Sequence, residues 1–166
     1  MSARIFTPHI LSELISAAAQ SPRKRQHLNI HQNYEDSCQR LFNAVGTDSY
    51  IRPHRHSLDP KSETLFAVKG KFALVVFDEQ GSPQQVSVFG TQLFGDIPPG
   101  VELSPGAWHT VVALSDEAVL LEIKAGPFDP QAAKELAPWA PEEGTPQAPH
   151  FLRSLHQLIA EYAPAG

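Results

Sequence analysis

Hydrophobic residues recur at helical spacing near both ends of the chain. Thr7 and Pro8 are typical of the cap and first residue of a helix, because a threonine hydroxyl accepts a backbone N–H and proline fits the first turn. The apolar residues that follow are Ile10, Leu11, Leu14, Ile15 and Ala18. The C-terminal set is Phe151, Leu152, Leu155, Leu158, Ile159 and Tyr162. The sequence therefore predicts an amphipathic helix at each end, the second packing on the main body or on a neighbouring subunit.

Between these helices, residues 41–125 consist of short β-rich segments separated by turn residues. Residues 69–71 and 79–82 carry glycine with polar neighbours, which is typical of turns. Residues 72–77 are apolar without interruption, as expected for a strand that is buried on both faces. This pattern predicts an antiparallel sandwich or barrel, and hence a mainly β fold.

A Pro-rich segment follows Gly126, and we interpret it as an extended arm rather than a second domain. A chain of 166 residues fits one domain. Within that domain we expect an N-terminal helix and lid segment at residues 1–37, a β-barrel at 38–126, and the arm with the C-terminal helix at 127–166.

Composition restricts the partners and the compartment. The formal net charge of −5 disfavours nucleic acid, and the basic cluster of Arg23, Lys24 and Arg25 is interpreted as solvated. The lone Cys38 excludes an internal disulfide, and we expect it to be a small buried hydrophobic residue. No targeting signal and no apolar stretch of ~20 residues is present, so a cytoplasmic location away from membranes is expected.

The strongest chemical signal is a pair of histidines two residues apart, His54 and His56. Residues i and i+2 of a strand point to the same face, so this spacing presents two imidazoles side by side. Imidazole nitrogens together with a carboxylate oxygen suit a divalent transition metal ion such as iron, manganese, nickel, cobalt or zinc.

The residues around this pair resemble the two motifs of the cupin superfamily. The matching positions are Gly46, His54, His56, Glu63, Gly70, Gly95, Pro105, Gly106 and His109, with Ala113 in the place of the family's Asn. Further segments resemble one branch, the WbuC family of small bacterial cupin-fold metalloproteins. They are residues 21–25, 29–31, 39–41, 43–44, 52–56, 126–128 and 137–141.

The resemblance implies a single-domain cupin jelly-roll β-barrel with one metal ion per chain, taken from iron, manganese, nickel and zinc. His54, His56, Glu63 and His109 would be the ligands. Three histidines and one glutamate leave coordination positions open, as catalytic metal sites do. The branch is often encoded near surface-polysaccharide genes and has no firmly established reaction. Cupins commonly form pairs, so a homodimer is expected.

Strand alternation indicates candidate groups around the metal. If His54 and His56 face inward, Tyr50 and Arg52 share their face, and Arg52 would hold an anionic group of a substrate or form a salt bridge with a residue such as Glu122. On the last strand Glu122 and Lys124 share a polar face, which lines the cavity or meets solvent. Glu122 is then a candidate general base.

Other candidates come from the segment before the barrel. His31 and Asn29 could close over its mouth, His31 as an acid or base and Asn29 as a hydrogen-bonding group. Gln39 and Asn43 are an even number of residues apart, so both could face inward and bind a polar substrate. Trp108 beside His109 is either a platform for a sugar ring or a core residue.

Motifs for nucleotides, serine nucleophiles and paired cysteines are not found in the sequence, so any reaction should depend on the metal. Three hypotheses remain open. The first is a metal-dependent isomerase or epimerase that acts on a small polar molecule such as a sugar derivative, and the second is an iron-dependent dioxygenase. The third is a metal- or sugar-binding module without turnover.

Overall fold

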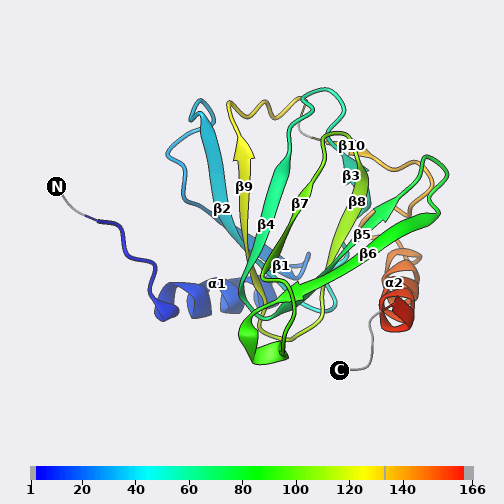
Figure 1. The fold of residues 1–166 in the computed structure, drawn as a ribbon, viewed down its shortest axis with the longest axis horizontal. Coiled ribbons are helices and arrows are strands. Elements are labelled where there is room, and N and C mark those ends of the chain that lie inside the picture. The colour runs from blue at the N-terminus through cyan, green and yellow to red at the C-terminus, as the bar shows by residue number, and fades with distance from the viewer. Residues whose placement is uncertain (1–2, 133, 163–166) are drawn as a thin grey trace.

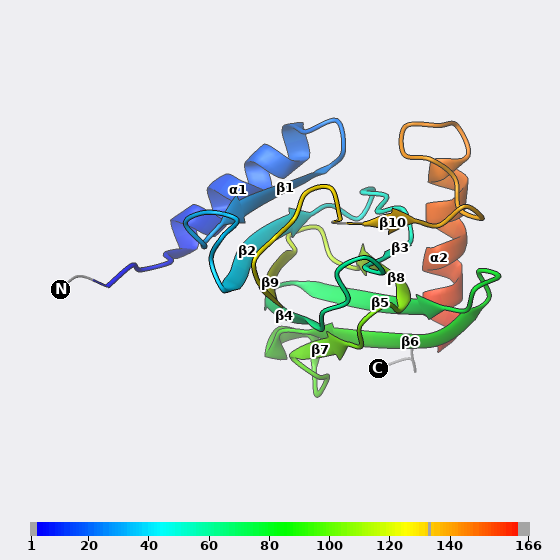
Figure 2. The same ribbon diagram turned by 90° about the horizontal axis from the view of Figure 1, so that it is seen from above.

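In the computed structural model, which describes residues 3–132 and 134–162, two five-stranded antiparallel sheets pack face to face. The strand order is β1-β2-β9-β4-β7 in the first sheet and β10-β3-β8-β5-β6 in the second. Figures 1 and 2 show the two sheets as layers, with α1 beside the first and α2 beside the second. The mainly β architecture and both terminal helices agree with the sequence prediction.

The elements follow one another along the chain with short connections. In the first half they are α1 (Pro8–Gln20), β1 (Arg25–Asn29), β2 (Cys38–Val45), β3 (His54–Arg55), β4 (Glu63–Lys69) and β5 (Lys71–Phe77). In the second half they are β6 (Pro83–Gly90), the short 3-10 helix η1 (Gln92–Phe94), β7 (Gly100–Leu103), β8 (Trp108–Ala113), β9 (Val119–Ala125), β10 (Glu135–Leu136) and α2 (Ala148–Tyr162).

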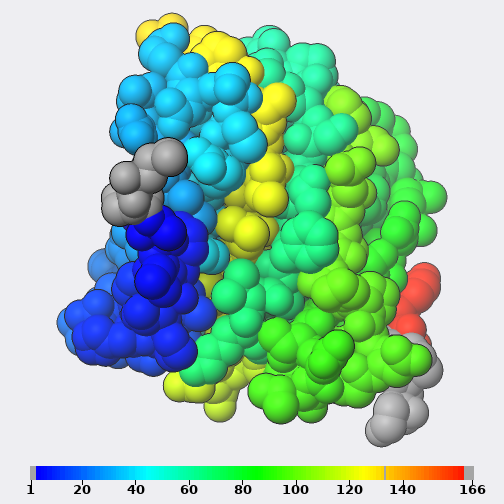
Figure 3. Space-filling view, turned by 60° about the vertical axis from the view of Figure 1, so that its left-hand side comes forward, coloured from blue at the N-terminus to red at the C-terminus, as the bar shows by residue number. Residues whose placement is uncertain are grey.

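Helix α1 begins as the sequence predicts. The Thr7 hydroxyl accepts from the Ile10 N–H at 3.5 Å, and Pro8 occupies the first turn. Leu14 and Ala18 are buried against Phe42 and Val119, which lie on the outer face of the first sheet. Figure 3 shows this face, with α1 over one end and the strands β9 and β4 visible beside it.

Helix α2 covers the outer face of the second sheet. Its apolar residues Leu152, Leu155 and Ile159 are buried in one cluster with Val75 of β5 and Val112 of β8. The periodicity of the C-terminal segment therefore reflects packing on the body of this chain.

The space between the sheets is apolar at one end and polar at the other. The apolar end is filled by a cluster that includes Phe72, Phe89, Leu103 and Leu120. β5 contributes to both this cluster and the one beneath α2, which explains why residues 72–77 are continuously hydrophobic. Buried polar side chains gather at the other end, and they form the candidate site.

Some details differ from expectation. Cys38 is exposed, so its prediction as a buried residue is wrong, because it occupies the first position of β2 at the end of the sheet. The segment expected as a lid contains β1, which pairs with β2 from Arg25↔Val45 to Asn29↔Leu41. The proposed division at residues 37 and 126 stays a prediction. Within residues 3–132 and 134–162, no helix has the length and apolar character to span a membrane.

Candidate metal centre

Three histidines converge at the polar end of the sandwich. His54 of β3 pairs directly with His109 of β8, and their ring centroids are 4.4 Å apart. His56 lies just beyond β3, and one ring nitrogen from each of the three histidines falls within 4.8 Å of the others. The predicted pair and the distant third histidine therefore meet in space.

Glu63 approaches the same point from the opposite sheet, as the first residue of β4. Its Oε2 atom lies 3.4 Å from Nε2 of His56 and 3.5 Å from Nε2 of His109. All four side chains are at least nine-tenths buried. The four predicted ligands thus form one cluster, held by strands of both sheets.

Backbone carbonyls fix two of the rings. Nδ1 of His54 lies 3.0 Å from the Arg52 carbonyl oxygen, and Nδ1 of His109 lies 2.9 Å from the Ala107 carbonyl oxygen. A carbonyl can only accept, so each Nδ1 carries the proton and donates. Nε2 of each ring then keeps its lone pair for a metal, which is the arrangement of metal-binding histidines in proteins.

The electrostatics favour a cation at this position. Burial lowers the pKa of His54 well below its usual value, so its ring is neutral at pH 7. Burial raises the pKa of Glu63, but the side chains of His109, His56 and Glu122 that contact it outweigh burial and hold that pKa well below the usual range. The neutral His54 ring and the ionised Glu63 carboxylate fit a divalent transition metal ion.

A cavity of about 310 Å³ opens beside this cluster. It is lined by Arg23, Arg25, His27, Asn29, His31, Tyr34, Gln39, Leu41, Asn43, His56, Glu122, Lys124, Phe128 and Lys134. Besides the candidate ligand His56, six predicted site residues are among them, namely Asn29, His31, Gln39, Asn43, Glu122 and Lys124. Of the two orientations considered for the polar face of β9, the structure therefore has the one that faces the cavity.

Glu122 lies in contact with the carboxylate of Glu63. Burial raises the pKa of Glu122 well above its usual value, and the negative charge of Glu63 raises it further. Two carboxyl groups this close cannot both be ionised at low cost, so Glu122 retains its proton and hydrogen-bonds to Glu63. A proton is thus held beside the candidate metal ligands.

His31 presents a nitrogen to the cavity. The ring is 7% exposed, and its Nδ1 lies 2.8 Å from the carbonyl oxygen and 3.1 Å from the backbone nitrogen of Arg40. Nε2 is buried and has no hydrogen-bond partner among the described residues. Such a nitrogen loses water without compensation unless a ligand contacts it.

Gln39 lines the cavity, but its amide nitrogen is used within the protein. Nε2 donates to the carbonyl oxygens of Asn33, Tyr34 and Asp36 at 3.2, 3.1 and 2.9 Å. These bonds hold the loop between β1 and β2 at the mouth of the cavity. The Tyr34 ring in this loop meets the Phe128 ring edge-on at 5.1 Å.

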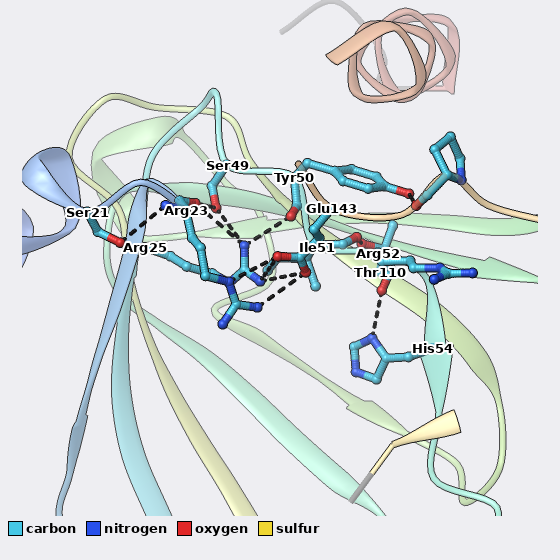
Figure 4. A network of polar contacts seen from close by, with 11 residues as sticks. Ser21, Arg23, Arg25, Ser49, Tyr50, Ile51, Arg52, His54, Thr110 and Glu143 are labelled. Atoms are coloured by element: carbon cyan, nitrogen blue, oxygen red, sulfur yellow. Dashed lines mark hydrogen bonds and ion pairs between the residues drawn. The ribbon is translucent and has the colours of Figure 1, made fainter. Parts of the chain in front are cut away.

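Tyr50 and Arg52 do not line the cavity, contrary to the prediction. Arg52 donates to the Ala137 carbonyl oxygen at 2.8 and 3.2 Å and lies 3.8 Å from Glu142 rather than near Glu122. The Tyr50 hydroxyl donates to the carbonyl oxygen of Pro141. Figure 4 shows the Arg52 guanidinium directed away from the His54 ring. Tyr50 and Arg52 do not share the face of His54 because regular strand structure begins only at His54.

Trp108 also lies outside the cavity, and of its two interpretations the core residue is correct. It is 4% exposed and packs in the cluster beneath α2. The Arg55 guanidinium lies 4.3 Å from the centroid of the Trp108 ring, and Nε1 of Trp108 donates to Glu79. It points to the opposite side of β8 from its neighbour His109.

Several cavity residues were not predicted from the sequence: Arg23, Arg25, His27, Tyr34, Leu41, Phe128 and Lys134. A usable signal existed in β1, where Arg25, His27 and Asn29 alternate with Gln26 and Leu28. The remaining residues come from loops or from different strands, and only the fold brings them together.

Comparison with known proteins identifies the fold. A family model described as "Domain of unknown function (DUF6016)" matches residues 6–89. No curated protein matches the sequence. Among solved structures, protein SO0799 from Shewanella oneidensis superposes with a TM-score of 0.52 and 11% identity, over 82% of this chain and 80% of that chain.

Oxalate decarboxylase from Bacillus subtilis superposes with a TM-score of 0.50 and 16% identity. The match covers 68% of this chain but only 27% of the decarboxylase. At such identities the likeness shows the fold alone, and that fold is the cupin jelly roll predicted from the sequence. Together with the three-histidine cluster, it supports a metal-binding cupin.

Proposed function

Because the chain belongs to the DUF6016 family, whose function is unknown, we propose a function from the geometry of its site: a metal-dependent enzyme that acts on a small polar molecule. The ligands would be the three histidines and Glu63. One observation carries the proposal. Three buried imidazoles converge within 4.8 Å, and the cavity beside them is lined by Glu122, whose pKa burial raises, and by His31, whose Nε2 has no hydrogen-bond partner among the described residues.

A divalent metal ion in this site would supply Lewis-acid polarisation of substrate oxygens. The protein supplies the positions of the proton-transfer groups. Glu122 holds a proton at its carboxyl group on one side of the cavity, and His31 offers Nε2 on another. A carboxyl group and an imidazole on two sides of one cavity are the groups that isomerisation or epimerisation by proton transfer requires.

We further propose that the substrate is a sugar or sugar derivative. Asn29 and Asn43 line the cavity with amides that both donate and accept, as hydroxyl groups require. The resemblance to the WbuC family, whose genes often lie near those for surface polysaccharides, supports the same class. If the bound metal is iron, the same ligand set also suits a dioxygenase.

Proton exchange tests this proposal directly. The metal-loaded protein would be incubated in D₂O with a panel of sugars, sugar acids and sugar phosphates, and proton NMR would follow the loss of C–H signals. We expect exchange with at least one compound, reduced at least tenfold in Glu122→Gln and unchanged in Glu102→Gln, an exposed glutamate outside the cavity. The absence of exchange and of product across the panel would overturn the enzymatic proposal.

A further inference from the structure

The charged side chains of the cavity indicate which class of small molecule the site would bind. This inference rests on the proposed function. Pairing across the first sheet places Lys124 of β9 directly opposite Glu63 of β4 and Gln39 of β2. Paired residues of an antiparallel sheet point to the same face. The Lys124 side chain therefore lies on the inner face, one strand away from a candidate metal ligand.

Lys124 makes no hydrogen bond or ion pair within residues 3–132 and 134–162, although its side chain is partly buried. Burial lowers the pKa of Lys124, whereas the nearby carboxyl groups of Glu63 and Glu122 raise it. A partly desolvated ammonium without a partner is unfavourable, and an anion from a ligand would compensate it.

Lys134 adds a second cation at the same place. It lines the same cavity, and its charge acts on His54, Glu122 and Lys124. Unlike Lys124, Lys134 is exposed, and within the described part of the chain its amino group forms no ion pair or hydrogen bond. Two lysines of the cavity are thus available to a ligand.

The two arginines that line the cavity share one carboxylate as their partner. Arg25 contacts both Glu143 carboxylate oxygens at 2.7 Å, and Arg23 contacts them at 3.0 and 3.2 Å. Figure 4 shows both guanidinium groups gathered around this carboxylate. Recognition of an anion therefore depends on the two lysines.

The net charge supports the same conclusion in either state of Glu122. A divalent ion with Glu63 leaves one positive charge, and the lysines add two more. Even an ionised Glu122 removes only one of these three. A neutral ligand would leave this excess charge uncompensated in a partly desolvated cavity.

Neutral hydrogen-bonding groups occupy the other strands of the sheet. Asn29 and Asn43 line the cavity from β1 and β2, and His31 Nε2 is buried there without a hydrogen-bond partner among residues 3–132 and 134–162. We propose that this protein binds a polyhydroxylated anion, with its carboxylate or phosphate at Lys124 and Lys134 and its hydroxyl groups at Asn29, Asn43 and His31.

Isothermal titration calorimetry with glucose, glucuronate and glucose 6-phosphate tests the proposal, with metal-loaded and metal-free protein measured in parallel. We expect at least one of the two anions to bind tenfold or more tightly than glucose, and the preferred anion distinguishes carboxylate from phosphate. The ratio of anion affinity to glucose affinity should fall about tenfold in Lys124→Met and in Lys134→Met. It should be unchanged in Lys71→Met, a lysine at the start of β5 outside the cavity.

Equal affinity for glucose and both anions, or an anion preference that survives in Lys124→Met, would overturn the inference, as would the absence of binding of all three probes at millimolar concentration. Failure of the metal function is a separate result. A protein that takes up no metal but prefers an anion through Lys124 would refute the proposed enzyme and support the anion site. Thermal unfolding of each variant confirms that a lost affinity does not reflect a lost fold.

Discussion

His54 and His109 lie directly opposite each other on β3 and β8, and the same device orients both rings. In each case Nδ1 donates to the carbonyl oxygen of the residue two positions earlier, Arg52 and Ala107 respectively. The local backbone of each strand thus fixes the tautomer without help from another side chain. This explains how two buried imidazoles in contact are both prepared to bind one cation.

Trp108 provides a test of which aromatic residues serve the cavity. We expect Trp108→Phe to lower the free energy of unfolding by about 1–3 kcal/mol, because it removes core packing and the bond to Glu79. Anion affinity, measured by calorimetry, should change less than twofold. Phe128→Ala, in the cavity wall, should weaken it more. A larger loss of affinity in the Trp108 variant would place that ring near the ligand.

Gln39 is expected to position the loop at the mouth of the cavity. Gln39→Ala leaves three carbonyl oxygens without their donor, and should lower the free energy of unfolding by about 1–2 kcal/mol. Hydrogen–deuterium exchange of residues 32–37 should accelerate. Gln85→Ala, on the exposed surface of β6, serves as the control. Unchanged exchange in this loop would refute the positioning role.

Gly126 provides a steric test of how the loop between β1 and β2 packs. A Cβ atom at this position would overlap the Asp36 carbonyl oxygen, so Gly126→Ala should cost about 2–3 kcal/mol of unfolding free energy. At Gly106 a Cβ meets open space, and Gly106→Ala should cost only the ~1 kcal/mol expected from its positive φ of 75°. Urea denaturation measures both values, and equal costs would contradict the packing of this loop.

Stability should depend on pH through Glu143. Burial raises its pKa, but hydrogen bonds from Arg23 and Arg25 outweigh burial and lower it below the usual value near 4.5. A depressed folded-state pKa stabilises the protein above the unfolded-state pKa, and this contribution is lost as the pH falls through the folded-state pKa.

Glu143→Gln should therefore cost about 1 kcal/mol at pH 7, a modest value because the pair is partly exposed. The difference from the wild type should shrink steadily below pH 4.5 in urea denaturation. A difference that is constant from pH 7 to pH 3 would show that the ion pair contributes nothing.

The sequence was sufficient to predict the clustering of the three histidines with Glu63 and the strand-rich centre. His54 and His56 share a face at a spacing of two, and residues 72–77 are apolar because both faces of β5 are buried. The prediction missed β1, where Arg25, His27 and Asn29 alternate with residues of which only Leu28 is apolar.

Tyr50 and Arg52 were misplaced for a related reason. Alternation predicts facing only within a regular strand, and the segment before His54 is irregular. Glu122 and Lys124 do face the cavity, because they belong to the seven-residue strand β9, where alternation holds. Charge pairing between distant segments, such as Arg25 with Glu143, depends on the fold and left no local signal.

We expect the clustered histidines to bind a metal ion, and plasma mass spectrometry of the purified, untagged protein measures this directly. We expect close to one transition metal ion per chain in the wild type and its loss in the His54→Ala/His56→Ala variant. A variant that lacks the exposed His9 and His150 should retain the metal. Wild-type protein without metal, even after reconstitution with iron, manganese, nickel and zinc, would contradict the account.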